Sequence, residues 1–226
     1  MLDGLAWLAL EVKYLEPARR FYEENLDLPV RSARDDEVHL AAGETDLRLR
    51  RPTSDPRGGL HTHFACSIPA GEYERWWDRL SGSFDLEESQ FGDARSLYCY
   101  DPDGNCVELG QRDVEGPGID GVFEVALEVR SLERAEAFYT ALGFEPVDRG
   151  GTRRRIRLSG PMALELWEPQ LGIADARGGV HVDLGFDVSE PAAVADSIAD
   201  AACSVDRAAD HVTVLDPDGH TLTFRS

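Results

Sequence analysis

The stretch Asp101-Pro102-Asp103-Gly104 occurs a second time in this chain, as Asp216-Pro217-Asp218-Gly219. Proline presets φ and glycine tolerates positive φ, so each stretch predicts a tight turn between two strands. The same duplication is visible upstream, where Ala9-Leu10-Glu11-Val12 returns as Ala126-Leu127-Glu128-Val129. Internal repetition on this scale indicates a duplicated domain.

Each copy divides into two units with the same order of elements: a strand, a helix and three short strands. Phe21-Tyr22 in the first predicted helix returns as Phe138-Tyr139 in the third. The segment 112–118 is rich in glycine and predicts a linker between the copies. The sequence therefore predicts an α+β protein with two domains, 1–112 and 119–226, built from four βαβββ units with curved mixed sheets.

Composition limits the location and the partners of the chain. The chain has 226 residues and 42% hydrophobic content, so each of the two copies, at about 110 residues, can bury a core. No apolar run approaches the ~20 residues of a membrane span, and no secretory signal opens the chain, so we expect a cytoplasmic protein without a membrane partner. Acidic residues outnumber basic ones by 43 to 23, which argues against nucleic acid, because that partner needs a basic surface. Lys13 is the only lysine, and this acidic composition is typical of a protein from a halophile.

Strand alternation predicts which side chains face the concave side of each sheet. In the opening strand of the third unit, Phe123, Val125 and Leu127 are expected under the helix, which leaves Glu124 on the concave side. The same alternation in the second unit and at the end of the third places four more polar side chains there: His61, His63, Glu108 and Glu165.

The chain resembles the vicinal oxygen chelate superfamily of glyoxalases, bleomycin-resistance proteins, epimerases and extradiol dioxygenases. The resemblance rests on the four βαβββ units, on the strand that leads to Phe-Tyr, and on the turn followed by Asn105-Cys106-Val107-Glu108-Leu109. Members commonly place a metal-binding glutamate where Glu108 stands. They place other ligands in the opening and closing strands of the units, so the resemblance implies two glyoxalase-like domains with such positions.

The positions that correspond to family ligands differ between the units. From unit one to unit four, the opening-strand and closing-strand residues are Trp7 and Arg48, His63 and Glu108, Glu124 and Glu165, and Asp183 and Thr223. Pairing within each copy would leave one site with His63 and Glu108 and another with Glu124, Glu165 and Asp183. Pairing across copies would instead bring units two and three together in one complete metal site of His63, Glu108, Glu124 and Glu165. We favour the second arrangement, because it gathers the competent donors in one cavity.

The resemblance implies a divalent metal ion, Zn, Ni, Co, Mn or Fe, and a small-molecule substrate. The favoured function is glyoxalase-type lyase or isomerase chemistry on a small α-hydroxycarbonyl or thiol adduct, with Glu108 or Glu124 as the catalytic carboxylate that transfers a proton through an enediolate. One alternative is a metal-free, bleomycin-resistance-like binding protein. A second is an extradiol-type dioxygenase, which would need two histidines, so His61 beside His63 keeps it open. Either a monomer or a homodimer is compatible with four units in one chain.

A structural interpretation stands beside each of these roles. In a chain with 43 acidic residues, a glutamate on a polar strand face is most often solvated. Histidines in strands are frequently structural or exposed. His61 and His181 follow the repeated Arg-Gly-Gly in both copies, which suggests a structural role for that pair.

Overall fold

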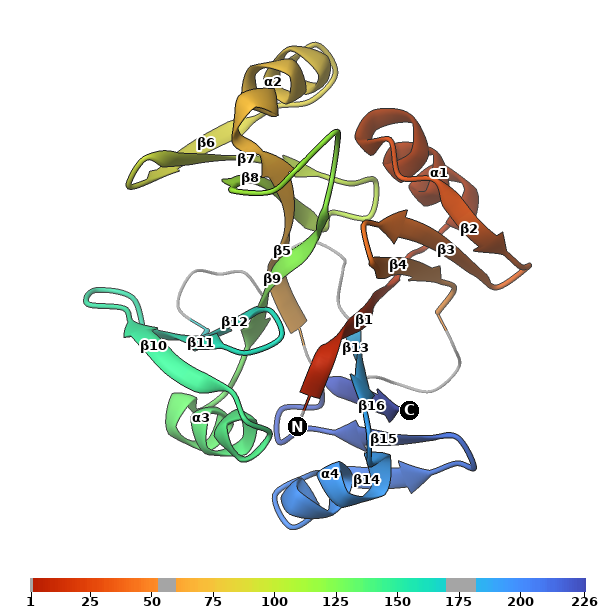
Figure 1. Ribbon diagram of the computed structural model, residues 1–226, viewed down its shortest axis with the longest axis vertical. Coiled ribbons are helices and arrows are strands. Elements are labelled where there is room, and N and C mark those ends of the chain that lie inside the picture. The colour runs from red at the N-terminus through yellow and green to blue at the C-terminus, as the bar shows by residue number, and fades with distance from the viewer. Residues whose placement is uncertain (1, 53–59, 170–181) are drawn as a thin grey trace.

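The computed structural model describes residues 2–52, 60–169 and 182–226, and it contains the four expected units (Figure 1). The elements of the first unit are β1 (Leu2–Glu11), α1 (Leu15–Arg20) with a π-helical turn over Phe21–Asn25, β2 (Val30–Ala33), β3 (Glu37–Ala42) and β4 (Thr45–Arg50). Those of the second are β5 (Leu60–Pro69), a 3-10 turn over Ala70–Glu72, α2 (Tyr73–Ser81), β6 (Glu87–Phe91), β7 (Ala94–Tyr100) and β8 (Cys106–Arg112).

The second copy repeats this order. The elements of the third unit are β9 (Gly121–Glu128), α3 (Leu132–Ala141), β10 (Glu145–Arg149), β11 (Arg155–Ser159) and β12 (Ala163–Trp167). Those of the fourth are β13 (Val182–Val188), α4 (Pro191–Ile198), β14 (Ser204–Arg207), β15 (His211–Leu215) and β16 (Thr221–Arg225). No helix in these described stretches is long and apolar enough to cross a membrane.

The strands form two mixed eight-stranded sheets, and each sheet takes one unit from each copy. Sheet A has the order β14-β15-β16-β13-β1-β4-β3-β2 and combines units four and one. Sheet B has the order β10-β11-β12-β9-β5-β8-β7-β6 and combines units three and two. The opening strands of the two units meet antiparallel at the centre of each sheet. The predicted α+β class and the pairing of units across copies are therefore confirmed, whereas the boundaries 1–112 and 119–226 stay a prediction about the sequence repeat.

The repeated Asp-Pro-Asp-Gly turn ties the two sheets together within each copy. The Asp101 Oδ1 atom accepts hydrogen bonds from the backbone of Asp103 and Asn105, which closes the turn between β7 and β8. Its Oδ2 atom accepts a hydrogen bond of 2.8 Å from the hydroxyl of Tyr22, which lies beside sheet A. In the second copy, the hydroxyl of Tyr139 donates an equivalent hydrogen bond of 2.8 Å to Asp216 Oδ2. Here the tyrosine belongs to the unit of sheet B and the aspartate to the unit of sheet A. The repeated Phe-Tyr and Asp-Pro-Asp-Gly motifs are thus two ends of one structural clamp.

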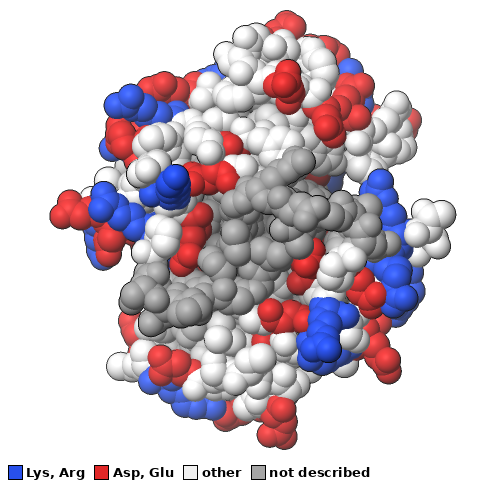
Figure 2. Space-filling view, turned by 180° about the vertical axis from the view of Figure 1, so that it is seen from behind, with Lys and Arg blue, Asp and Glu red and all other residues white. Residues whose placement is uncertain are grey.

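The core fills the space between each sheet and its helices. It is formed by alternate apolar residues of the central strands, such as Leu8 and Leu10 in β1 and Phe64 and Cys66 in β5, all of them at most 1% exposed. Asp and Glu side chains are distributed over the described part of the face in Figure 2, with Arg side chains among them. The alternation that buries one face of each sheet leaves the opposite face for polar side chains.

Candidate metal centre

Three polar side chains converge on the open face of sheet B. His63 lies on β5, Glu108 on β8 and Glu124 on β9, and these three strands are neighbours in the order β9-β5-β8. One donor atom from each residue lies within 4.8 Å of the other two. The His63 Nε2 atom is 3.2 Å from Glu124 Oε1 and 3.4 Å from Glu108 Oε2. These three side chains could hold a metal ion, and they are called the metal cluster below.

Strand register explains why these three residues meet. Glu108 and Glu124 are both cross-strand partners of Ala65, one on each side of β5. His63 lies two positions before Ala65, and residues two apart on a strand point to the same face. The small Ala65 side chain therefore stands between two glutamates, with the imidazole beside them.

A bulge in β9 changes the predicted placement of Phe123. Ala65 pairs with Glu124 and Cys66 pairs with Val122, so Phe123 is an extra residue without a partner on β5. Val122 consequently enters the core, while Phe123 is only half-buried and lines a pocket on the open face. The prediction that Phe123 lies under the helix was wrong, because simple alternation does not hold across a bulge.

The metal cluster is buried and rich in negative charge. Glu108 and Glu124 expose 4% and 6% of their side chains. Burial lowers the pKa of the His63 imidazole, but the hydrogen bond with Glu124 and the charges of both glutamates outweigh it and raise the pKa above 6.5. Burial raises the pKa of Glu124, whereas His63 and Arg157 lower it more strongly, to a net value below 4.5. An imidazole and two carboxylates in this geometry fit a divalent cation.

Glu165, the fourth predicted ligand, has other partners. It lies on β12, next to β9, and it is buried. Trp167 Nε1 donates a hydrogen bond of 2.8 Å to its Oε2 atom, and Arg157 and Arg155 approach its Oε1 atom at 3.1 and 3.3 Å. Its charge raises the pKa of His63, so it belongs to the same electrostatic environment. The structure thus brings three of the four predicted ligands together and places Glu165 among arginines beside them.

Arg157 is a site residue that the sequence analysis did not identify. It lies on β11 directly opposite Glu165, and its guanidinium forms ion pairs with both Glu124 and Glu165. Opposite charges on facing positions of neighbouring strands are a recognisable signal, but using it requires the strand register. Arg157 links Glu165 to the metal cluster.

Tyr98 is a second residue that the sequence analysis missed. It is the cross-strand partner of Glu108, to which its hydroxyl is hydrogen-bonded. Its ring meets the His63 ring edge-on, with 6.1 Å between centroids. Burial, together with the charge and hydrogen bond of Glu108, raises the pKa of the Tyr98 hydroxyl, so the phenol keeps its proton and donates a hydrogen bond to the carboxylate.

Sheet A carries a different set at the corresponding positions. Asp183 stands where sheet B has His63, and it accepts hydrogen bonds from Trp7, Arg50 and Thr223 at 3.1, 2.8 and 2.9 Å. Arg48 stacks on the Trp7 ring at 3.8 Å. Within the described stretches, the His63, Glu108 and Glu124 group is the only set of three such donors close enough for a metal ion. That units one and four lack a competent ligand set stays a prediction.

A glycine makes room for the tryptophan in sheet A. Gly185 is the cross-strand partner of Trp7, and it occupies the position that Ala65 has opposite Glu124. A Cβ atom on Gly185 would lie 2.0 Å from a Trp7 ring carbon. The indole therefore fills the place of a ligand carboxylate in sheet A. The side chains of His61 and His181 lie outside the described residues.

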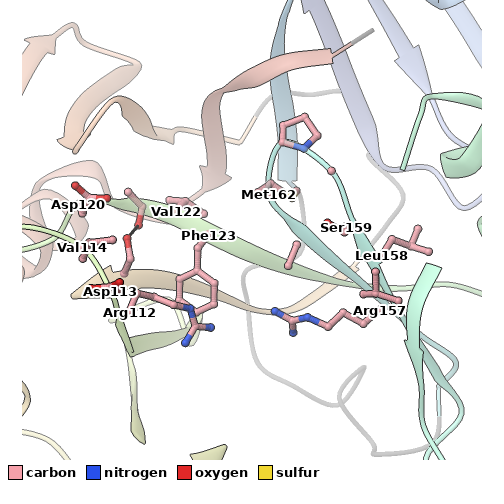
Figure 3. A pocket seen from close by; sticks show the side chains of 16 residues that line it. Arg112, Asp113, Val114, Asp120, Val122, Phe123, Arg157, Leu158, Ser159 and Met162 are labelled. Carbon is pink, nitrogen blue, oxygen red and sulfur yellow. Dashed lines mark hydrogen bonds between the residues drawn. The ribbon is translucent and has the colours of Figure 1, made fainter. Parts of the chain in front are cut away.

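A pocket of about 620 Å³ lies beside the metal cluster (Figure 3). Arg157, which pairs with Glu124, forms one wall, and Arg112 and Phe123 form another. Figure 3 shows the guanidinium groups of Arg112 and Arg157 extending toward one another. The pocket is large enough for a small organic molecule, and Arg157 is the lining residue that connects it to the metal cluster.

Comparison with known proteins supports the fold. Residues 4–109 match the family model described as the Glyoxalase/Bleomycin resistance protein/Dioxygenase superfamily. The resemblance to this superfamily is thereby confirmed. A comparison with curated proteins gave no match.

Solved structures of similar fold cover nearly the whole chain. A proposed dioxygenase from Bacillus subtilis subsp. subtilis str. 168 superposes with a TM-score of 0.76 at 15% identity, covering 99% of this chain and 85% of that one. Glyoxalase I from Zea mays superposes with a TM-score of 0.73 at 18% identity, covering 99% and 92%. Its V278E variant gives a TM-score of 0.72 at 20% identity, with the same coverage. At these identities the similarity establishes the fold, and function has to be argued from the site.

Proposed function

We propose that this chain is a metal-dependent enzyme of the glyoxalase type, acting as a lyase or isomerase on a small α-hydroxycarbonyl or thiol-adduct substrate. The observation that carries the proposal is the convergence of His63, Glu108 and Glu124 beside a pocket. These three side chains would hold the divalent ion, which would polarise the carbonyl oxygen of the substrate. The identity of the metal follows from none of these contacts, because zinc, nickel, cobalt, manganese and iron all accept imidazole and carboxylate ligands.

The residues around the metal cluster divide the remaining tasks. Glu108 and Glu124 are the two carboxylates next to the pocket that can take a proton from the carbon adjacent to the carbonyl and return it to the neighbouring carbon. Tyr98 holds Glu108 through its hydroxyl, and Arg157 holds Glu124, so each carboxylate has its own positioning partner. Burial of both glutamates keeps bulk water from competing for the proton.

The test measures proton exchange and metal dependence together. The hemithioacetal of methylglyoxal with a simple thiol is incubated in D₂O with protein that has been reconstituted with Zn²⁺, Ni²⁺, Co²⁺, Mn²⁺ or Fe²⁺. We expect isomerisation, with deuterium entering at the carbon next to the carbonyl, with at least one ion. Glu108→Gln and Glu124→Gln should each lower the rate by 10²-fold or more, on the order of a general-acid or general-base contribution. Glu115→Gln, which changes an exposed glutamate outside the site, is the matched control.

A second function is supported by the ion pairs of Arg157. This guanidinium forms ion pairs with both Glu124 and Glu165 and offsets part of their negative charge, as a metal-free binding protein would require. The two functions differ in one measurement. Protein that takes up no divalent ion after reconstitution, yet binds small molecules in the pocket, would support the binding protein and exclude the enzyme.

A further inference from the structure

We propose that the pocket formed by Arg112, Phe123 and Arg157 binds the oxyanion end of a small organic ligand, a carboxylate or a phosphonate attached to an apolar body. This inference deepens the proposed function, on which it rests for the role of the metal cluster at the other end of the ligand. The oxyanion belongs to the part of the substrate that does not react.

Among the described residues, no carboxylate forms an ion pair with Arg112. Its guanidinium carbon lies 3.7 Å from the centroid of the Phe123 ring, and its one hydrogen bond among the described residues goes to the carbonyl of Gln111 at 2.8 Å. Carboxylates outnumber basic residues by 43 to 23 in this chain, and most arginines in the described stretches pair with one. A half-buried arginine that faces a pocket without such a pair is suited to an anionic ligand.

Strand geometry sets the distance between the two ends of the ligand. Glu108, Gly110 and Arg112 are alternate residues of β8, so they lie on one face of the strand. The Cα atoms of Glu108 and Arg112 are therefore about 13 Å apart, from four steps of ~3.3 Å. Gly110 leaves the strand surface between them open to Phe123, since a Cβ atom there would lie 3.0 Å from the tip of the ring. A ligand that reaches from the metal cluster to Arg112 would lie along this surface and against the ring.

A second guanidinium faces the first. Arg157 lines the same pocket. Burial lowers the pKa of Arg112, the charges of Glu108 and Glu124 raise it, and the charge of Arg157 lowers it, with a net value below the usual one. Figure 3 shows the two groups extending toward each other across the pocket. An oxyanion between the two groups would accept hydrogen bonds from both guanidiniums, and it would give Arg112 the carboxylate-like partner that Arg157 already has in Glu124 and Glu165.

The remaining walls match an apolar body. Val147 and Met162 contribute aliphatic side chains to the pocket, and Phe123 contributes its ring. Asp113 and Asp120 also line the pocket, but both are exposed to solvent, and Figure 3 places them at the end away from Arg157. Arg157 thus lies at the end of the pocket next to the metal cluster, and Arg112 lies at the other end, near the solvated aspartates.

The test uses three probes of similar shape on protein freed of metal by chelation. Isothermal titration measures the binding of benzoate, phenylphosphonate and the neutral benzamide. We expect at least one of the two anions to bind ten times or more as tightly as benzamide, and the tighter one identifies carboxylate or phosphonate as the preferred group. Arg112→Gln should weaken that anion by about tenfold or more, and Arg112→Lys by less, because it keeps the charge and loses the planar donor pair. Arg20→Gln on α1 removes an exposed arginine and is the control for the loss of one positive charge.

Two results would overturn the proposal. Equal binding of benzamide and both anions would show that the pocket does not select an oxyanion. Unchanged anion binding in Arg112→Gln, with thermal unfolding like that of the parent protein, would show that Arg112 is not the recognition residue. If Arg112→Gln does not fold, Phe123→Leu replaces it and is judged by the same criterion. That substitution removes the ring on which the guanidinium stacks. The titration contains no metal, so Glu108→Gln can abolish metal binding while anion binding stays the same. This proposal and the proposed function can therefore fail separately.

Discussion

The Tyr-Asp clamps predict unequal losses of stability in the two copies. Tyr22→Phe removes a hydrogen bond of 2.8 Å to the buried Asp101, and Tyr139→Phe removes the equivalent bond of 2.8 Å to the buried Asp216. Both phenylalanines keep the ring in the core, so the main change is the loss of one hydrogen bond between the sheets.

The surroundings of the two carboxylates set the magnitudes. A hydrogen bond to a charged group contributes about 1.5–3 kcal/mol, and a buried acceptor atom left without a partner adds its desolvation penalty. Asp101 Oδ2 retains a second bond of 2.7 Å from the Asn105 side chain, so Tyr22→Phe should lower the free energy of unfolding by about 1.5 kcal/mol. Position 220 is histidine in place of that asparagine, and Asp216 Oδ2 keeps no other hydrogen bond among the described residues. Tyr139→Phe should therefore lower it by about 3 kcal/mol.

Urea unfolding followed by tryptophan fluorescence measures both losses. The double variant should lose the sum of the two within about 0.5 kcal/mol, because the clamps share no partner. Tyr14→Phe is the control, since Tyr14 is 62% exposed and should change stability by less than about 0.5 kcal/mol. Losses below 0.5 kcal/mol in both single variants, or a larger loss for Tyr22→Phe than for Tyr139→Phe, would refute the assignment of the repeated motifs to these clamps.

Two further substitutions test sheet A. Gly185→Ala should lower the free energy of unfolding by about 1–3 kcal/mol, because its Cβ atom would overlap the Trp7 ring, and adding Trp7→Leu should recover part of that loss; equal stability of Gly185→Ala and the parent in urea would contradict the close contact. Burial raises the pKa of Glu37, but His39 and Arg50 lower it more, to a net value below 4.5, so its stabilisation is present above its unfolded pKa and is lost as the pH falls through the folded value. Glu37→Gln should therefore cost on the order of 1 kcal/mol at pH 7 and almost nothing in acid below both pKa values, and a difference that stays constant between these pH values would be evidence against the role of its charge.

The sequence predicted the features that depend on local pattern. The repeat gave the four units, and alternation in β5 and β8 placed His63 and Glu108 on the open face. The pairing of units across copies followed from unequal donor sets, because grouping the competent residues required units two and three to share a sheet. The order of strands in both sheets confirms that pairing.

The features that depend on register were not predicted. The bulge that turns Phe123 toward the pocket adds one residue to β9, and no turn or glycine signal marks it in the sequence. Tyr98 faces Glu108 on the neighbouring strand, and Arg157 faces Glu165 on its neighbouring strand. Their roles become visible only when the partner strand and its register are known.

The number of metal ions bound per chain tests the central claim most directly. Equilibrium dialysis of the parent protein against Zn²⁺ and, separately, Ni²⁺ should give one tightly bound ion per chain, because sheet B holds the His63, Glu108 and Glu124 group while the corresponding side chains of sheet A are engaged with one another. Glu108→Gln should lose that ion, and Asp183→Asn should retain it. No bound ion in the parent protein with either metal, or one that persists in Glu108→Gln and disappears in Asp183→Asn, would contradict the account.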